Sequence, residues 1–197
     1  LIYASACSLY DKHIPTVKFE KSSVIARPNS PYLKVKYEGE QLFHTLNSSC
    51  VIRIPAPLGI NLPDRAVAMR FLKQAIDGQT IKLWGSGMRE QNYVDVSDIA
   101  DIFFKAVFSK SVGVFNIASN VPTTMLELAS VITRIAKKGS FAFTKIIDPL
   151  EGEYARYSNK LALEEFGWVP RMPFEESIRS MVYGLHMNSQ IYDLNRN

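Results

Sequence analysis

The chain has 197 residues, of which 47% are hydrophobic and 21% are charged, and a formal net charge of +4. This length supports one or two globular domains, and the composition is ordinary for a soluble protein. No dense run of Lys and Arg is interleaved with aromatic residues, and no apolar run approaches a membrane span, so we expect neither a nucleic-acid partner nor a membrane segment. The mild positive charge suits a small anionic ligand.

Cysteine and histidine usage argues against disulfide and metal chemistry. Cys7 and Cys50 are the two cysteines, and their spacing is typical of neither a disulfide framework nor a metal site. His13, His44 and His186 are isolated from one another and show no metal-ligand spacing. We therefore predict no bound metal, and a reducing cytoplasm as the default location.

Apolar periodicity and turn residues predict strands that alternate with helices, which indicates an α/β protein. Strands are expected at residues 1–6, 50–55, 80–84 and 113–118. Helices are expected at residues 31–48, 64–77, 96–109, 123–137, 158–166 and 173–187. Turn formers that include Pro28 and Asn29 predict a loop over residues 7–30, and Ser30 and Pro31 suit the start of the helix that follows.

Tyr32 and Lys36 lie four residues apart on that predicted helix, so their side chains share one face. A free phenol has a pKa of about 10 and is a poor base at neutral pH. A nearby ammonium favours the phenolate and lowers that pKa toward the working range. We interpret the pair as a proton-transfer device for making and unmaking a carbonyl; an amphipathic helix with a solvated lysine is the alternative.

Further segments repeat the motifs of one family in order along the chain. They are residues 1–10, 30–40, 51–59, 83–100, 114–119 and 164–170. Together these segments resemble the extended short-chain dehydrogenase/reductases, specifically the nucleotide-sugar epimerases and dehydratases. The resemblance implies NAD or NADP as cofactor and a nucleotide-diphosphate sugar as substrate.

The resemblance also implies a domain organisation. We expect the C-terminal portion of a Rossmann-like doubly wound parallel sheet with a smaller α/β substrate-binding subdomain. Residues 1–60 would belong to the dinucleotide-binding domain, and residues 61–197 mainly to the substrate subdomain, with some segments returning to the first. Family members pair as homodimers through the Tyr/Lys helix, where Leu42, Phe43 and Leu46 would serve the interface or pack in the core.

One expected motif is missing from the sequence. No glycine-rich fingerprint that would cradle the pyrophosphate of a dinucleotide is present. The chain begins at Leu1 within an apolar segment that is typical of a strand. We interpret this as the absence of the N-terminal half of a Rossmann domain from this chain.

The resemblance assigns catalytic and cofactor roles to particular residues. Tyr32 would be the base, Lys36 would lower its pKa and hold the nicotinamide ribose, and Ile54 and Pro55 would line the cofactor. The family's catalytic Ser/Thr position falls on Ala6. Ser5 and Ser8 are neighbours that would replace this hydroxyl, or else they only satisfy local backbone groups.

Substrate contacts follow from the same resemblance. Arg89, in a glycine-rich segment, would grip the diphosphate, or else form a surface salt bridge; its position is two residues before the family's usual arginine, which falls on Gln91. Arg156 would be a second diphosphate clamp. Lys82 and Trp84 would lie near the nucleobase, although Trp84 would equally suit the core.

Two positions bear on the type of reaction. Dehydratases of the family carry an Asp-Glu pair where this chain has Cys7 and Ser8, which favours an epimerase over a dehydratase. Ala56 stands where many epimerases have a substrate-contacting Asn. We therefore predict an NAD(P)-dependent epimerase of a nucleotide-diphosphate sugar, with a reductase, a dehydratase or a non-catalytic nucleotide-sugar-binding relative as alternatives.

Overall fold

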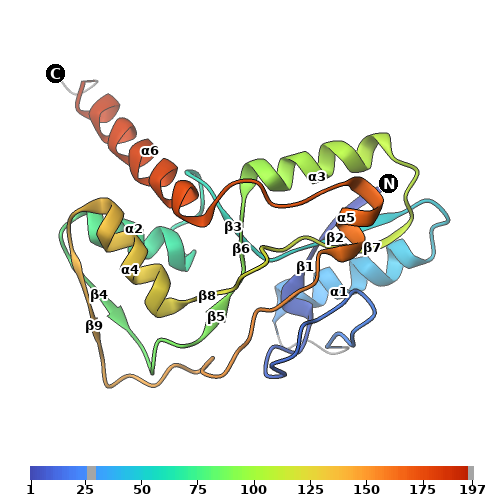
Figure 1. Cartoon of the computed structure of the whole chain (residues 1–197), viewed down its shortest axis with the longest axis horizontal. Coiled ribbons are helices and arrows are strands. Elements are labelled where there is room, and N and C mark those ends of the chain that lie inside the picture. The colour runs from blue at the N-terminus through green and yellow to red at the C-terminus, as the bar shows by residue number, and fades with distance from the viewer. Residues whose placement is uncertain (26–29, 195–197) are drawn as a thin grey trace. The chain divides into compact units, whose positions relative to one another are not determined.

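The computed structural model describes residues 1–25 and 30–194 (Figure 1). The expected turn residues Pro28 and Asn29 lie outside the described residues. Strands alternate with helices along the chain, which confirms the α/β class. The strands are β1 Ile2–Ala6, β2 Cys50–Ile54, β3 Ala56–Leu58, β4 Thr80–Leu83, β5 Glu90–Gln91, β6 Tyr93–Asp95, β7 Gly113–Asn116, β8 Thr123–Thr124 and β9 Ser140–Phe143.

The helices are α1 Pro31–His44, α2 Val67–Ile76, α3 Val96–Phe108, α4 Met125–Ala136, α5 Lys160–Phe166 and α6 Phe174–Leu194, and a short 3-10 helix, η1, covers Cys7–Leu9. Every helix expected from the sequence is present; the ends of five differ by at most four residues, and α6 continues to Leu194, seven residues past the expected end at 187. α1 ends at His44 instead of residue 48. Its last carbonyls are satisfied by side chains, because Thr45 Oγ1 donates to Leu42 O at 2.7 Å and Ser49 Oγ donates to Phe43 O at 2.6 Å.

The residues form two compact units, and the chain passes between them several times. Unit 1 contains Leu1–Pro57, Glu90–Pro122 and Gly152–Arg171. Unit 2 contains Leu58–Arg89, Thr123–Glu151 and the segment from Met172 onward. The first change of unit thus falls between Pro57 and Leu58.

Unit 1 is built on a parallel sheet with the strand order β1-β2-β7. Ile2 lies opposite Cys50, which in turn lies opposite Gly113. Figure 1 shows α1 and α3 on opposite faces of this sheet. The core on the α3 side consists of apolar residues of the sheet, β6, α3, α5 and the segments after β7 and α5, which are Cys50, Ile52, Val94, Ile102, Ala106, Phe115, Ile117, Ala162, Phe166 and Trp168.

Asp98 has a structural role at the start of α3. The buried indole of Trp168 donates to the Asp98 carbonyl at 2.9 Å, and the Asp98 carboxylate accepts the Arg171 N–H at 3.1 Å. These bonds join α3 to the segment that follows α5.

Unit 2 combines a two-stranded parallel sheet, β4-β9, with three helices. α4 contacts α2, α6 and both strands. A capping box starts α4, since the Thr124 hydroxyl accepts the Glu127 N–H while the Glu127 carboxylate accepts the Thr124 N–H. The sequence did not predict β9, whose four side chains are all exposed and therefore lack the alternation that marks a half-buried strand.

Candidate active site

Tyr32 and Lys36 lie in the first half of α1, where the sequence places them on one face. The Lys36 ammonium is 5.6 Å from the centre of the Tyr32 ring, and it donates to the backbone carbonyl of Ala4 at 2.7 Å. Tyr32 is 58% exposed. The structure thus brings the phenol and the ammonium together beside β1, with one side of the phenol open to a ligand.

The electrostatics of Tyr32 differ from what we expected of a Tyr-Lys pair. Partial burial raises the pKa of Tyr32, because withdrawal from water disfavours the phenolate, and a thiolate at Cys7 would act in the same direction. The Lys36 ammonium does not outweigh this effect at 5.6 Å while it is hydrogen-bonded to Ala4. In this structure Tyr32 is therefore a protonated phenol at neutral pH.

The residues around the family's Ser/Thr position have different environments. Ala6 and Cys7 are buried, and the Cys7 thiol donates to the Arg53 carbonyl at 3.3 Å. Ser5 is also buried, and its hydroxyl donates to the carboxylate of Glu40. Ser8 in η1 is half-buried, and its hydroxyl has no hydrogen-bond partner among the described residues. Of the two candidate serines, Ser8 is therefore the one with a hydroxyl that remains available.

The predicted cofactor-lining residues follow the carboxyl end of β2. Ile54 is half-buried and packs against the core of unit 1, and Pro55 comes next. The carboxyl ends of parallel strands are where ligands of open α/β sheets bind. Lys36 also bonds near the carboxyl end of β1, so these residues lie at the same edge of the sheet.

Glu40 and Arg53 form a buried ion pair beside this site that the sequence analysis missed. The two Arg53 nitrogens Nε and Nη2 donate to the two Glu40 oxygens at 2.8 and 2.6 Å. One signal was available, because Glu40 follows Lys36 by four residues and so shares its helix face. Nothing in the sequence indicated that Arg53, in a run of buried strand residues, would be its partner.

Arg156, the predicted second diphosphate clamp, lies in unit 1 against Glu90. Its Nε and Nη2 donate to the Glu90 carboxylate, with distances of 2.5 to 3.2 Å. The guanidinium also stacks 5.1 Å from the centre of the Tyr154 ring. One edge of the guanidinium and one of its flat faces thus already have partners within unit 1.

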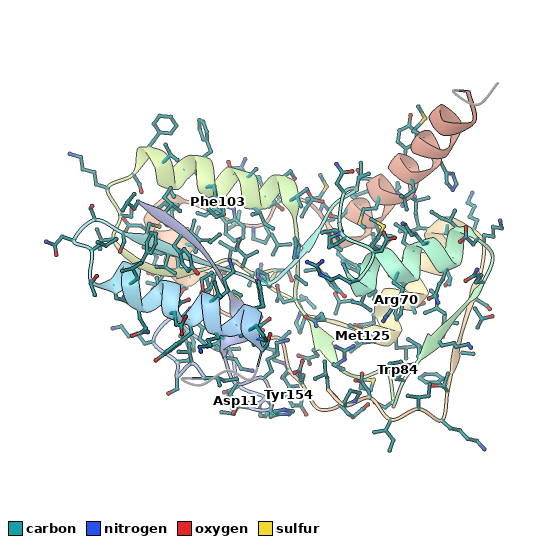
Figure 2. All side chains as sticks on the ribbon, turned by 180° about the vertical axis from the view of Figure 1, so that it is seen from behind. Asp11, Arg70, Trp84, Phe103, Met125 and Tyr154 are labelled. Carbon is teal, nitrogen blue, oxygen red and sulfur yellow. The ribbon has the colours of Figure 1, made fainter. Side chains whose placement is uncertain are left out.

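Unit 2 contains a cavity of about 110 Å³ that brings together the other predicted substrate residues. Arg89, Lys82 and Trp84 all line it. Figure 2 shows Arg70, Trp84 and Met125 close together in the region of α2, α4 and the end of β4. The remaining lining residues are Val67, Phe71, Leu83, Asp148, Pro149 and Leu150.

The cations of this cavity are not equivalent. Arg89 is mostly buried, and its Nε donates to Asp148 at 2.9 Å. Arg89 therefore forms an ion pair, which was the alternative to a diphosphate clamp, but this pair lies in the cavity wall instead of on the surface. Arg70, which we did not single out from the sequence, is exposed and has no ion-pair partner among the described residues. Trp84 is 44% exposed, and the residue is therefore not part of the core.

A larger cavity, of about 620 Å³, lies in unit 1 away from the candidate catalytic residues. It is lined by the first residues of β1 and β2 and by the segments before β2 and β7, among them Leu1, Ser48 and Lys110. This is the amino-terminal edge of the parallel sheet, whereas ligands bind at the opposite edge in this kind of architecture. We therefore do not assign it to the active site.

Among the described residues, no group of His, Cys, Asp or Glu has the arrangement of a metal site. Over the same residues, no helix combines the length and apolarity needed to cross a membrane.

Comparison with protein families identifies the part of the chain that carries the candidate catalytic residues. The model of the "NAD dependent epimerase/dehydratase family" matches residues 1–118, which is more than half of the chain. The chain is 28% identical over 175 residues to UDP-glucose 4-epimerase of Mycolicibacterium smegmatis, covering 83% of this chain and 55% of that protein. It is 20% identical over 194 residues to dTDP-D-glucose 4,6-dehydratase of Mus musculus, covering 92% and 54%.

Solved structures show the same fold. UDP-glucose 4-epimerase from Thermotoga maritima, solved with UDP-glucose, aligns with a TM-score of 0.85 at 20% identity, covering 95% of this chain and 63% of that chain. The dTDP-glucose 4,6-dehydratase from Bacillus anthracis, solved in complex with NAD, aligns with a TM-score of 0.83 at 20% identity, covering 96% and 62%. These similarities confirm the Rossmann-like fold. The chain spans little more than half the length of the curated relatives it matches.

Proposed function

Because the chain belongs to the NAD dependent epimerase/dehydratase family, we propose that it carries the catalytic Tyr-Lys helix and the substrate subdomain of an NAD(P)-dependent nucleotide-sugar epimerase. The observation that carries this proposal is the placement of Tyr32 and Lys36, 5.6 Å apart, at the carboxyl edge of a parallel sheet. The relatives that are epimerases and dehydratases of UDP- and dTDP-sugars support the substrate class.

Tyr32 would move the proton of the reacting sugar hydroxyl. In an epimerase the hydroxyl is oxidised first, so the phenolate of Tyr32 would accept its proton, and the resulting phenol would return a proton to the carbonyl oxygen when the carbonyl is reduced. Partial burial raises the pKa of Tyr32 and so opposes the phenolate. Lys36, beside the ring, would stabilise this phenolate. Ser8 would supply the hydrogen bond to the reacting oxygen, because its hydroxyl is available and that of Ser5 is directed to Glu40.

The residues of unit 1 fit part of a dinucleotide. Lys36 has three N–H donors, of which one is directed to Ala4, and the others would be available to ribose hydroxyls. Ile54 and Pro55, both half-buried, would present an apolar surface at the end of β2. NAD, when bound, supplies the hydride acceptor. Lys36, Tyr32, Ile54 and Pro55 are the residues of this chain that would hold it.

The cavity of unit 2 would bind the nucleotide. Its volume of about 110 Å³ is well below the roughly 300–1,000 Å³ of a site for a whole drug-sized ligand, so it suits a flat ring such as a nucleobase. Trp84 offers an exposed indole for stacking, and Lys82 adds a cation. Arg70 would bind a phosphate, because its guanidinium is exposed at the cavity, whereas that of Arg89 is paired with Asp148.

A second candidate is a non-catalytic protein that binds a nucleotide sugar. It is favoured by one observation, the alanine at position 6 together with the commitment of the Ser5 hydroxyl to Glu40. Loss of one hydrogen-bond donor to a reacting oxygen costs about a hundredfold or more in rate. Ser8 decides between the two candidates, because the epimerase needs it and the binding protein does not.

We further propose that α1 takes part in a homodimer. Val35 and Leu42 are each more than 60% exposed on this helix, whereas Phe43 is half-buried and its ring stacks 4.8 Å from that of Tyr3. The interface would therefore use Val35 and Leu42, with Phe43 in the interior. A helix face of this kind suits pairing with a second copy.

The test is to incubate the purified protein with UDP-glucose and NAD and to follow the sugar by NMR. Appearance of the 4-epimer, lost in Tyr32→Phe and reduced in Ser8→Ala, supports the epimerase. Accumulation of NADH in proportion to substrate indicates a reductase or dehydrogenase instead. Binding of both UDP-glucose and NAD without any conversion, at enzyme concentrations that approach the substrate concentration, leaves the non-catalytic candidate.

A further inference from the structure

Helix α1 attaches to its sheet in an unusual way. Of the residues of α1, all of which the structure describes, Glu40 alone is fully buried, with 1% of its surface exposed. The apolar Val35 and Leu42 are exposed instead. A helix normally docks through an apolar stripe, whose contacts are not directional. The deepest contact of α1 is instead a carboxylate, whose contacts are directional.

Both oxygens of the Glu40 carboxylate have assigned partners. Arg53 approaches with its fork, Nε to Oε1 at 2.8 Å and Nη2 to Oε2 at 2.6 Å. The Ser5 hydroxyl also donates to Oε1. One residue of the helix is thus bonded to β1 through Ser5 and to β2 through Arg53. A bidentate pair fixes orientation as well as distance.

The pair is extended by a second layer of buried polar groups. Arg53 Nη1 donates to the Tyr10 hydroxyl at 2.6 Å, and that hydroxyl donates to Asn116 Oδ1 at 2.8 Å, at the end of β7. Burial opposes the charge of Arg53, but the bonds to Glu40 and Tyr10 outweigh it and raise the pKa of the guanidinium. The cluster of Ser5, Tyr10, Glu40, Arg53 and Asn116 therefore joins all three strands of the sheet to α1.

The spacing along α1 connects this cluster to the candidate catalytic pair. Tyr32, Lys36 and Glu40 follow one another at intervals of four residues, so they lie along one side of the helix. A rotation or a one-turn shift of α1 would break the Arg53 and Ser5 bonds to Glu40 together. Slippage on an apolar surface would carry no such penalty, because apolar contacts re-form in the new position.

We propose that Glu40, Arg53 and Ser5 form a buried positioning cluster that sets the register of α1 on the sheet and thereby places Tyr32 and Lys36. A buried ion pair is weak evidence of a stabilising role, because desolvation cancels much of its attraction, whereas a role in fixing one arrangement among several is better attested. The effect of the cluster on catalysis rests on the proposed function, whereas its effect on the placement of Tyr32 does not.

The experiment compares the position and environment of Tyr32 in variants that stay folded. Glu40→Gln removes the charge from the pair, and Glu40→Met combined with Arg53→Met replaces the whole pair by apolar side chains, which often keeps stability. Ser5→Ala removes a single bond. The matched control is Glu38→Gln, because Glu38 forms an exposed pair with Lys34 on the same helix.

The primary readout is the NMR titration of ring-labelled tyrosine, with the Tyr32 signal assigned from Tyr32→Phe and each variant kept below its melting temperature. We expect the double variant to retain its melting temperature within a few degrees, by the physics of apolar replacement, while the Tyr32 signal shifts, splits or titrates at a different pH. Ser5→Ala should change the signal in the same direction by less, and Glu38→Gln should match the wild type.

A Tyr32 signal and titration that are unchanged in every folded cluster variant would overturn the proposal and leave the cluster a structural one. This readout needs no turnover, so it tests the positioning role of the cluster even if the wild type is inactive and the proposed function fails. If the wild type is active, the cluster variants should lower kcat by about tenfold to a hundredfold with KM nearly unchanged, as expected for a misplacement of catalytic groups of about 1 Å.

Discussion

The Lys36 ammonium donates to the carbonyl of Ala4 across 2.7 Å, which ties the middle of α1 to β1 two residues before that strand ends. The same ammonium lies 5.4 Å from the centre of the Tyr3 ring and 5.6 Å from that of Tyr32. Lys36 is therefore held on the sheet side of the helix by the protein itself, with donors left over for a ligand. A residue that is already oriented loses less freedom when it binds.

Lys36 is proposed to stabilise the Tyr32 phenolate and to bind the ribose of the cofactor, and replacement of its charge tests the first role. Lys36→Met keeps the length of the side chain and removes the charge, so the phenolate of Tyr32 loses its stabilising neighbour. We expect turnover of a nucleotide sugar to fall by about 10²–10⁴-fold, the usual contribution of general acid–base catalysis. Steady-state kinetics with NAD and UDP-glucose provides the measurement.

Lys36→Arg is the informative comparison, because it keeps a positive charge. A rigid guanidinium does not reproduce the three rotatable donors of an ammonium, so we expect partial activity only. Full activity in Lys36→Met would exclude a role of the ammonium in catalysis and would contradict the assignment of Lys36 to the catalytic pair.

Gly39 allows α1 to approach β1 closely. A methyl group added at this position would overlap the phenol ring of Tyr3. We expect Gly39→Ala to destabilise the fold by about 1–3 kcal/mol, the usual cost of overpacking, as measured by urea denaturation. In a Tyr3→Leu background the same change should become neutral or stabilising, because alanine is the better helix former by about 1 kcal/mol. The same loss of stability in both backgrounds would refute the assigned contact.

The sequence predicted the helices of this fold well because their signals are local. The apolar positions of α2 and α4, Pro31 at the start of α1, and the spacing of Tyr32 and Lys36 depend on residues a few positions apart. β9 was missed since its side chains are all exposed and give no alternating pattern. The six segments of the family resemblance were found because they run in order, and the family match over residues 1–118 supports those that lie within it.

The roles of individual polar residues were harder to predict because they depend on partners far away in the chain. Ser5 is a catalytic candidate from its sequence neighbours alone, and its hydroxyl donates to Glu40, 35 residues later. Arg89 is paired with Asp148, and Arg156 with Glu90, across 59 and 66 residues. No sequence pattern indicates which of several carboxylates an arginine will meet. Arg70 was overlooked for the same reason, because its access to a cavity is a property of the folded unit.

Arg70 and Trp84 predict a measurable nucleotide site in unit 2. The chain has two tryptophans, and Trp168 is fully buried in the core of unit 1, so a ligand that stacks on Trp84 should quench fluorescence through that residue. We expect UDP to quench the emission of the wild type and not that of Trp84→Phe. Arg70→Gln should weaken UDP binding about tenfold, a loss of about 1.4 kcal/mol.

The matched control is Arg65→Gln, because Arg65 is exposed just before α2 and does not line the cavity. It should bind UDP with the affinity of the wild type, apart from a small loss from the removed charge that added salt abolishes by screening. Equal loss of affinity in the Arg65 and Arg70 variants would show that only the net charge matters. Quenching that persists in Trp84→Phe would place the nucleotide elsewhere.

The buried thiol of Cys50 predicts a loss of stability at alkaline pH. Cys50 is 3% exposed, and burial raises its pKa from 9.0 to about 11 because the thiolate is disfavoured out of water. In the unfolded chain the thiol ionises at the lower value. The stabilising contribution is therefore fully present below pH 9 and is lost as the pH rises through 11, with a slope of about 1.4 kcal/mol per pH unit.

Urea denaturation at pH 8, 9, 10 and 11 measures this slope, and Cys50→Ala should make it shallower. Ser49→Ala is the control, because Ser49 is buried next to Cys50 and does not titrate, so it should shift the whole curve without changing its slope. Identical slopes for the wild type and Cys50→Ala would mean that Cys50 ionises equally readily in the folded protein, and that its environment is wetter than the structure shows.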